Sequence, residues 1–145
     1  MNIESIIKER NKGWKKKPEI PEWVDLEDVS LDQFFTKPEI AKKYYLKTLK
    51  FLKKENINIE DCLFVEPSAG DGSFFKLLPK NQRIGLDLYP MAEGIIKKDF
   101  LNWTPPKTDK KIIFIGNPPF GYRAWLALNF MNHASKFADY IFFIL

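Results

Sequence analysis

Short, continuous runs of apolar residues recur along the second half of this chain, with polar and helix-like stretches between them. A run of four to six apolar residues bounded by turn residues is typical of a strand that is buried on both faces of a parallel sheet. The pattern predicts strands at Cys62–Glu66, Arg83–Asp87, Ile112–Ile115 and Tyr140–Leu145, and a weaker one at Ile95–Ile96.

Helical periodicity appears between and before these runs. The strongest helix is predicted from Glu39 to about Glu55, with Pro38 in its first turn, where proline is favourable. Its apolar side is predicted to consist of Ala41, Tyr44, Tyr45, Thr48, Leu49 and Leu52, with lysines opposite. A second helix is predicted at Ser73–Leu78 and a third at about Tyr122–Ala138. One side of the third helix would carry Ala124, Ala127, Leu128, Met131, Ala134 and Ala138.

Strands that alternate with helices predict an α/β fold with a mostly parallel, Rossmann-like sheet of about five strands. Residues 33–145 would form this core. Residues 1–32, which are irregular and interrupted by Pro18 and Pro21, would form an N-terminal arm with a short helix at Ile3–Arg10.

Composition narrows the class of protein. The chain has 145 residues, 45% of them hydrophobic and 29% charged, which fits one globular domain. Cys62 is the only cysteine, so no intramolecular disulfide can form, and this suits a reducing compartment. No apolar run reaches the roughly 20 residues of a membrane span, and no signal-peptide pattern is seen. We expect a cytoplasmic location and no membrane partner.

The net charge is +4, with lysines clustered at 15–17, 42–43 and 53–54. A basic surface suits a polyphosphate partner, because neutralising phosphates releases counterions. Solvated helix faces explain the same clusters equally well, so charge alone does not decide the partner.

Polar residues stand where several predicted strands end. Glu66 and Asp87 close the first two strands, Asp99 follows the weak strand, and Gly116-Asn117 follows the strand at Ile112–Ile115. In open α/β sheets, ligands bind at the carboxyl ends of strands, near the point where the strand order reverses. These residues therefore predict a ligand site.

A glycine-containing turn, Glu66-Pro-Ser-Ala-Gly-Asp-Gly-Ser-Phe74, follows the first strand. Gly70 and Gly72 permit a tight turn and a close approach of ligand to backbone. The turn lacks the G-x-x-x-x-G-K-[ST] pattern of a P-loop, and Phe75 stands where a dinucleotide motif has its third glycine. A simple connection between a strand and a helix explains such a turn equally well.

Asp87 stands where an acid accepts hydrogen bonds from ribose hydroxyls in nucleotide-binding α/β folds. Asp99 offers an acceptor for an adenine amino group, and the ring of Phe100 offers a stacking surface. Core packing is the alternative role for Phe100, and helix capping or a surface turn is the alternative for Asp87.

The motif Asn117-Pro118-Pro119-Phe120 is the most specific signal. Two prolines after a buried strand fix an extended backbone and remove two N–H donors, which leaves carbonyl oxygens beside the Asn117 amide oxygen. Such acceptors suit a planar amino group, and they would favour a pyramidal nitrogen whose lone pair is free to attack. A structural Pro-Pro turn is the alternative.

In the order and content of these motifs, the chain resembles the gamma-class amino-methyltransferases of DNA. That family has an F-x-T-P motif, then E-P-x-x-G-x-G-x-F, an acid, D-F and N-P-P-[YF]. The corresponding segments here are Phe34–Pro38, Glu66–Phe74, Asp87-Leu88, Asp99-Phe100 and Asn117–Phe120.

The resemblance implies that S-adenosylmethionine is the cofactor and that the chain methylates adenine N6 in DNA, as in restriction-modification systems. It implies cofactor contacts from Phe34, Thr36, Glu66, Ser68, Gly70 and Asn117. It further implies that Asp87 binds the ribose, that Leu88 and Phe100 pack on the cofactor's adenine, and that Asp99 accepts from its amino group. Asn117 and the Pro118 carbonyl would bind the target amine of a flipped-out base, on which Phe120 would stack. Pro119 completes this catalytic motif.

Two features depart from the family pattern. Lys37 separates Thr36 from Pro38, where the family has proline directly after threonine. The family's fold also continues with two more strands and usually a target-recognition region, so we expect an incomplete core that self-associates or needs a C-terminal partner region. No metal site is predicted, and His133 is interpreted as a packing or surface residue of the last helix.

Alternative activities share this chemistry. Similar Asn-Pro-Pro-aromatic motifs occur in RNA adenine methyltransferases and in glutamine methyltransferases of release factors, and N4-cytosine is a further possible target. The Glu-Pro start of the glycine turn and the Phe-Phe-Thr stretch favour DNA over RNA. A degenerate, non-catalytic module that binds cofactor or nucleic acid is the alternative from another functional class.

Overall fold

The computed structural model of the chain describes residues 36–119 and 125–145. The predicted arm at 1–32, with its short helix at Ile3–Arg10, lies outside the described residues, as do Phe34 and Phe120.

The centre of the molecule is a sheet of five parallel strands. These are β1 (Cys62–Glu66), β2 (Arg83–Asp87), β3 (Ile95–Lys97), β4 (Lys111–Gly116) and β5 (Tyr140–Phe143). Their spatial order is β3-β2-β1-β4-β5, so the chain adds strands first on one side of β1 and then on the other. Every pairing is parallel. The predicted α/β fold with a Rossmann-like parallel sheet is therefore confirmed.

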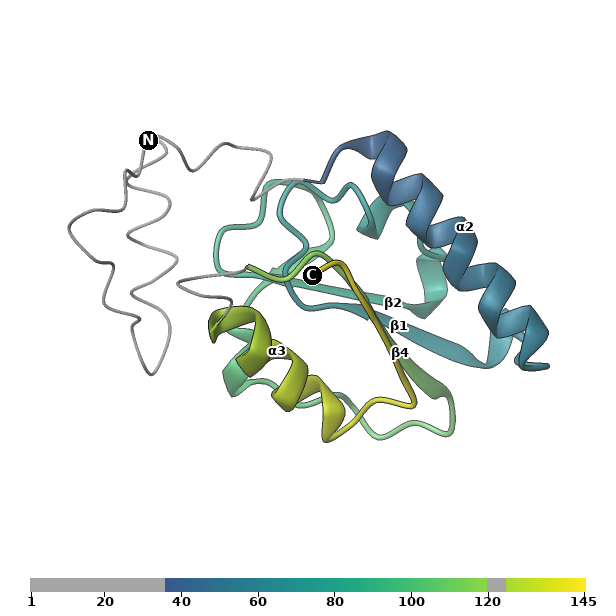
Figure 1. Cartoon of the computed structure of the whole chain (residues 1–145). Helices are drawn as coiled ribbons and strands as arrows, with labels where there is room; N and C mark the ends of the chain where they lie inside the picture. The colour runs from purple at the N-terminus through teal and green to yellow at the C-terminus, as the bar shows by residue number, and fades with distance from the viewer. Residues whose placement is uncertain (1–35, 120–124) are drawn as a thin grey trace.

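Helix α2 (Pro38–Lys54) covers one face of the sheet (Figure 1). Its buried residues Ala41 and Leu52 share a core cluster with Phe64 of β1 and Ile113 of β4. At the β5 end, the ring of Phe51 meets Tyr140 and Phe142 edge-on at centroid distances of 5.6 and 5.4 Å. The apolar side of α2 and one face of the sheet thus form a single apolar layer.

Helix α3 (Trp125–Ser135) lies on the opposite face (Figure 1). Leu126 and Phe130 of this helix pack with Phe114 of β4 and with Phe100 in the short 3-10 helix η5 (Phe100–Asn102). The Phe100 and Phe130 rings lie 5.0 Å apart between centroids. The result is a three-layer arrangement with the sheet in the middle.

Three further 3-10 helices precede strands: η2 (Ile59–Asp61) lies between α2 and β1, and η3 (Phe75–Leu77) and η4 (Lys80–Gln82) lie between β1 and β2. The helix predicted at Ser73–Leu78 is therefore wrong, since only the single turn η3 forms there. Leu78 precedes Pro79 and has an extended ψ of 148°, as a residue before proline prefers, so no α-helix can continue through it.

Other predicted boundaries and faces need smaller corrections. The last helix ends at Ser135 and not at Ala138, because Phe137 N donates three residues back, to Ala134 O, and closes a tighter turn. Tyr44 and Leu128 were predicted on the apolar sides of their helices, but they are 41% and 53% exposed. Phe130, which the predicted set omitted, is fully buried instead.

Neither helix in the described ranges 36–119 and 125–145 is long and apolar enough to cross a bilayer. Within those same ranges no group of three or more His, Cys, Asp or Glu residues is arranged to hold a metal ion.

Candidate functional site

The residues predicted to form a site gather at the carboxyl edge of the sheet. Glu66 ends β1, Asp87 ends β2 and Asn117 directly follows β4. Strands β1 and β4 are neighbours, yet the chain leaves β1 toward β2 on the other side. The loops after β1 and β4 therefore diverge, which is the arrangement that opens a ligand site in α/β sheets.

The glycine turn after β1 depends on two residues with positive φ. Gly70 has φ +53° and Gly72 has φ +85°, conformations that residues with a side chain rarely adopt. Gly72 N donates to Ala69 O at 2.8 Å, and Met91 N, from the loop after β2, donates to Gly70 O at 3.0 Å. The turn is thus fixed both internally and by the neighbouring loop.

Asp87 joins these two loops. Its Oδ2 accepts from Gly70 N at 2.9 Å and its Oδ1 accepts from Tyr89 N at 2.8 Å, while the residue is only 3% exposed. Asp87 does not cap a helix, which was one alternative; its bond from Tyr89 N closes a turn, as the other alternative had it, but the residue is buried and not at the surface. Its predicted contact with a ribose stays a prediction.

Glu66 is buried at the end of β1, with 3% of its surface exposed. Its Oε2 has no hydrogen-bond partner among the described residues. Burial raises the pKa of Glu66 well above the ordinary 4.5, and the negative charge of Asp87 raises it further, while a hydrogen bond from the Phe75 backbone opposes the shift. An acid in these surroundings favours a cationic or hydrogen-bond-donating ligand.

The end of β4 packs directly against Glu66. A Cβ placed on Gly116, whose φ is +145°, would lie 3.0 Å from Glu66 Cγ and 3.3 Å from its Oε1. Only glycine therefore allows this close approach, and it sets the following residue, Asn117, beside the end of β1.

Asn117 presents a second buried acceptor. Its Oδ1 has no hydrogen-bond partner within the part of the chain that the structure describes. Pro118 is fully buried and Pro119 half-buried, and neither has an N–H to donate. Buried polar atoms in native proteins are nearly always paired, so Glu66 Oε2 and Asn117 Oδ1 at adjacent strand ends indicate a place for a ligand with donor groups.

Asp99 and Phe100 follow β3. Asp99 caps η5, with Oδ1 accepting from Leu101 N at 2.9 Å and Oδ2 accepting from Asn102 Nδ2 at 2.6 Å. Phe100 is fully buried, and its ring contacts Phe114, Phe130, Trp103 and His133. Core packing, the alternative considered for Phe100, is therefore what the structure shows, and its stacking on a cofactor stays a prediction.

The remaining predicted cofactor residues lie around this edge. Ser68 and Leu88 are half-buried, in the loops after β1 and β2, and Leu88 packs against the same core cluster as Phe100. Thr36 is half-buried, two residues before α2. The predicted contacts of Phe34 and Phe120 lie outside the described residues.

His133 is a packing residue, as predicted. Its Nε2 lies 2.7 Å from Trp103 O, and its ring meets Phe100 and Phe137 edge-on. It ties α3 to the segment that follows Asp99.

Two contributors were missed in the sequence. Gly116 was predicted only as part of a strand end, although a glycine directly before Asn-Pro-Pro is a signal of close backbone approach. The loop of Tyr89 and Met91, which braces the glycine turn, has no motif that would reveal it.

Comparison with protein-family models, curated proteins and solved structures finds no match for this chain. The site itself therefore carries the indication of function.

Proposed function

We propose that this chain binds S-adenosylmethionine and transfers its methyl group to the exocyclic amino group of a base, with adenine N6 in DNA as the favoured target. The observation that carries the proposal is the pair of buried, unpartnered acceptors at adjacent strand ends, Glu66 Oε2 and Asn117 Oδ1.

The proposed binding of S-adenosylmethionine is supported by the chemistry of the residues around β1 and β2. S-adenosylmethionine carries an ammonium group, a sulfonium charge, ribose hydroxyls and an adenine. Asp87 supplies acceptors, Glu66 supplies a buried carboxyl group whose ionised form a cationic ligand would stabilise, and the glycine turn lets a ligand approach the backbone without a Cβ in the way. The donor groups and positive charge of such a ligand would satisfy what the site leaves unpaired.

The proposed methyl transfer to an amino group is supported by the segment after β4. Asn117 Oδ1 and the Pro118 carbonyl would accept the two hydrogens of a base amino group, which favours a pyramidal nitrogen with a localised lone pair. What bound S-adenosylmethionine supplies is an activated methyl group on a positively charged sulfur. The amine nitrogen would form the new N–C bond as the S–C bond breaks, and the proton that the nitrogen then loses would pass to solvent.

The first test is binding, measured by calorimetry with S-adenosylmethionine and with its demethylated product. The second is transfer of a radiolabelled methyl group to adenine-containing DNA, to RNA and to a release-factor glutamine substrate, each offered separately. Binding together with transfer to DNA adenine is the expected result. Binding without transfer to any acceptor would indicate a cofactor-binding module, and no binding at millimolar concentration would overturn the proposal.

A further inference from the structure

The excess positive charge of the chain is concentrated in one helix. Residues 37–55, which comprise α2 and its flanks, contain seven of the 23 lysines and arginines but only two of the 19 aspartates and glutamates. The remaining 16 basic and 17 acidic residues nearly cancel. The net charge of +4 is therefore a property of α2 and not of the whole surface.

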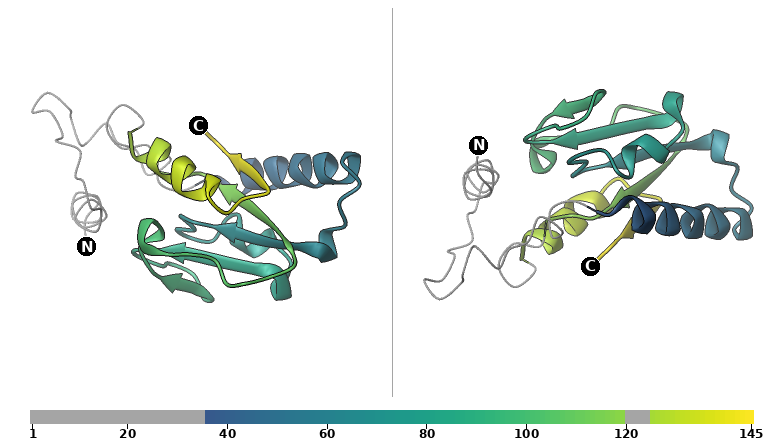
Figure 2. Two further views of the ribbon diagram at one scale, coloured as in Figure 1. Left: turned by 90° about the horizontal axis from the view of Figure 1, so that it is seen from below. Right: turned by 90° about the horizontal axis from the view of Figure 1, so that it is seen from above.

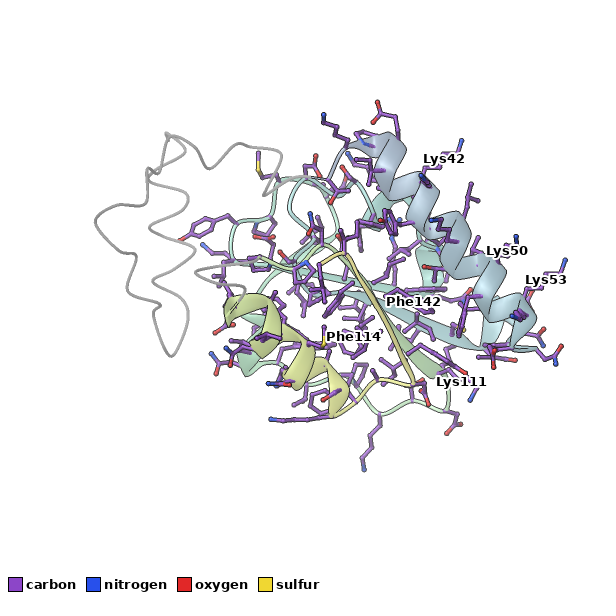
Figure 3. The ribbon with its side chains drawn as sticks, viewed as in Figure 1. Lys42, Lys50, Lys53, Lys111, Phe114 and Phe142 are labelled. Carbon is purple, nitrogen blue, oxygen red and sulfur yellow. The ribbon has the colours of Figure 1, made fainter. Side chains whose placement is uncertain are left out.

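These charges lie on the outer side of the helix. The buried side of α2 is formed by Ala41, Thr48 and Leu52. The exposed lysines are Lys42, Lys43, Lys47, Lys50, Lys53 and Lys54, which we call the lysine face. Figure 3 shows three of them, Lys42, Lys50 and Lys53, projecting from α2 away from the sheet.

Four members of the lysine face form a straight row. Lys43, Lys47, Lys50 and Lys54 are spaced by four, three and four residues, so they follow one line along the helix. At 1.5 Å per residue the row is about 16 Å long, a length over which one strand of B-DNA presents about five phosphates.

Acidic side chains do not neutralise the lysine face. Among the described residues no ion pair involves any of its six lysines. Lys47 Nζ lies 5.5 Å from the centroid of the exposed Tyr44 ring, a contact that leaves the ammonium group accessible. A row of accessible, unneutralised ammonium groups is a surface for an extended polyanion.

We propose that the lysine face of α2 is a docking surface for the phosphate backbone of a nucleic acid. The proposal builds on the nucleic-acid substrate proposed above, and it adds where the polymer is held. Because α2 leads through η2 into the start of β1, it runs opposite to the strands, and its first turn lies toward the carboxyl edge that carries Glu66 and Asn117 (Figure 1). A backbone held on α2 would therefore lead toward the proposed site.

A membrane surface fits these observations less well. A basic amphipathic helix binds lipid by inserting its apolar face. In α2 that face is buried against the sheet, with Leu52 fully inaccessible, and the ring of Phe51 is engaged by Tyr140 and Phe142. The exposed aliphatic residues of α2 are Ile40 and Leu46, which lie six residues apart and so do not form a continuous apolar face.

The test compares two variants of the full chain that lose the same charge. One carries Lys43→Gln, Lys47→Gln, Lys50→Gln and Lys54→Gln, and glutamine has a helix propensity close to that of lysine. The matched control replaces four exposed lysines outside α2, namely Lys80, Lys107, Lys111 and Lys136, by glutamine. Binding of a short fluorescein-labelled DNA duplex is measured by anisotropy between about 50 and 200 mM salt.

We expect the α2 variant to lose at least about tenfold in affinity near 0.1 M salt. Its log–log salt slope should decrease in magnitude by up to about 3.6, since each of the four lost phosphate contacts removes about 0.9. The control should change little. Equal losses in both variants, or no DNA binding by the unaltered chain, would overturn the proposal. Binding to phosphatidylserine vesicles without binding to DNA, if it is lost in the α2 variant, would also overturn the proposal.

Calorimetry with S-adenosylmethionine on the same samples tests the proposed function separately, because the substitutions avoid Glu66 and Asn117.

Discussion

At the scale of single residues, the Glu66 carboxyl group is held where its charged form is unfavourable. It is buried, one oxygen lacks a partner, and its pKa is raised by burial and by Asp87. A folded acid with a raised pKa keeps a proton that the unfolded chain releases. Its contribution to stability is therefore full below about pH 4.5 and is lost as the pH rises through the folded pKa. A cationic ligand would stabilise the ionised Glu66 carboxylate and so offset this loss of stability.

This gives a first prediction for Glu66→Gln. The variant lacks the titration, so its free energy of unfolding should exceed that of the unaltered chain by an amount that grows as the pH rises above 4.5. Its affinity for S-adenosylmethionine should fall. Urea denaturation from pH 5 to 8 measures the first effect and calorimetry the second, with the exposed Glu60→Gln as control. A variant that is less stable than the unaltered chain at pH 8 would contradict the assignment.

Cofactor binding should itself depend on pH for the same reason. A cationic ligand favours the ionised form of Glu66, so binding should release a proton wherever the free carboxyl group is still protonated. Affinity should then rise with pH across the window above 4.5. Calorimetry in two buffers of different ionisation enthalpy measures the proton release, which should disappear in Glu66→Gln. Affinity that is flat with pH would argue against a charge contact at this carboxyl group.

Asn117 and Asp87 should separate binding from chemistry. Asn117→Ala should leave cofactor affinity nearly unchanged but lower methyl transfer at least about 100-fold, the scale seen when one preorganised polar group that serves a transition state is lost. Asp87→Ala should instead weaken cofactor binding by at least about 1 kcal/mol, because it removes an acceptor and the tie between Gly70 and Tyr89. Asn81→Ala, exposed in η4, is the control. Near-normal turnover by Asn117→Ala would contradict the acceptor role and show that Asn-Pro-Pro is only a structural turn.

At the scale of elements, the strands were predictable and the turns between them were not. Strands β1 and β2 form at the predicted residues, because continuous apolar runs bounded by polar residues have few other ways to be buried. The segment after Gly72 looked helical from its residues, yet Pro79 and the preceding extended residue Leu78 limit it to the turn η3. The two unpaired acceptors depend on how β1 and β4 meet, which no local pattern encodes.

The contact between β2 and η3 gives a prediction at this scale. A Cβ on Gly85 would lie 2.7 Å from Phe75 Cδ2, and the Phe75 ring cannot retreat easily because the Arg83 guanidinium lies 4.1 Å from its centroid. Gly85→Ala should therefore destabilise the fold by about 1–3 kcal/mol through overpacking. Urea denaturation measures it, and Phe75→Leu added to Gly85→Ala should recover part of the loss. Additive effects of the two substitutions would mean that the ring is not the obstacle.

At the scale of the whole molecule, the charge and the apolar surface occupy different parts of the same side. The lysine face lies along the outside of α2, whereas the Phe51, Tyr140 and Phe142 rings form a half-exposed apolar strip where α2 meets β5. The two surfaces adjoin, because Lys47 and Lys54 stand four residues before and three residues after Phe51 and so flank its ring on the helix. Neither feature belongs to the sheet edge that carries Glu66 and Asn117, so each can be altered while the proposed site stays intact.

The margin of the sheet at β5 carries the last prediction. Within the described residues β5 pairs only with β4, and Figure 2 shows it at one edge of the sheet. Apolar edge strands with free backbone groups tend to pair with other chains, and a charge placed on the edge opposes this. We expect the 145-residue chain to show a mass that rises with concentration in light scattering. Leu145→Lys, at a residue that is 62% exposed just after β5, should reduce this association without changing the melting temperature. A monodisperse monomer at high concentration would show that this edge does not pair with another chain. Equal association by Leu145→Lys would place the contact elsewhere. The apolar strip at Phe51 would then be the next surface to alter.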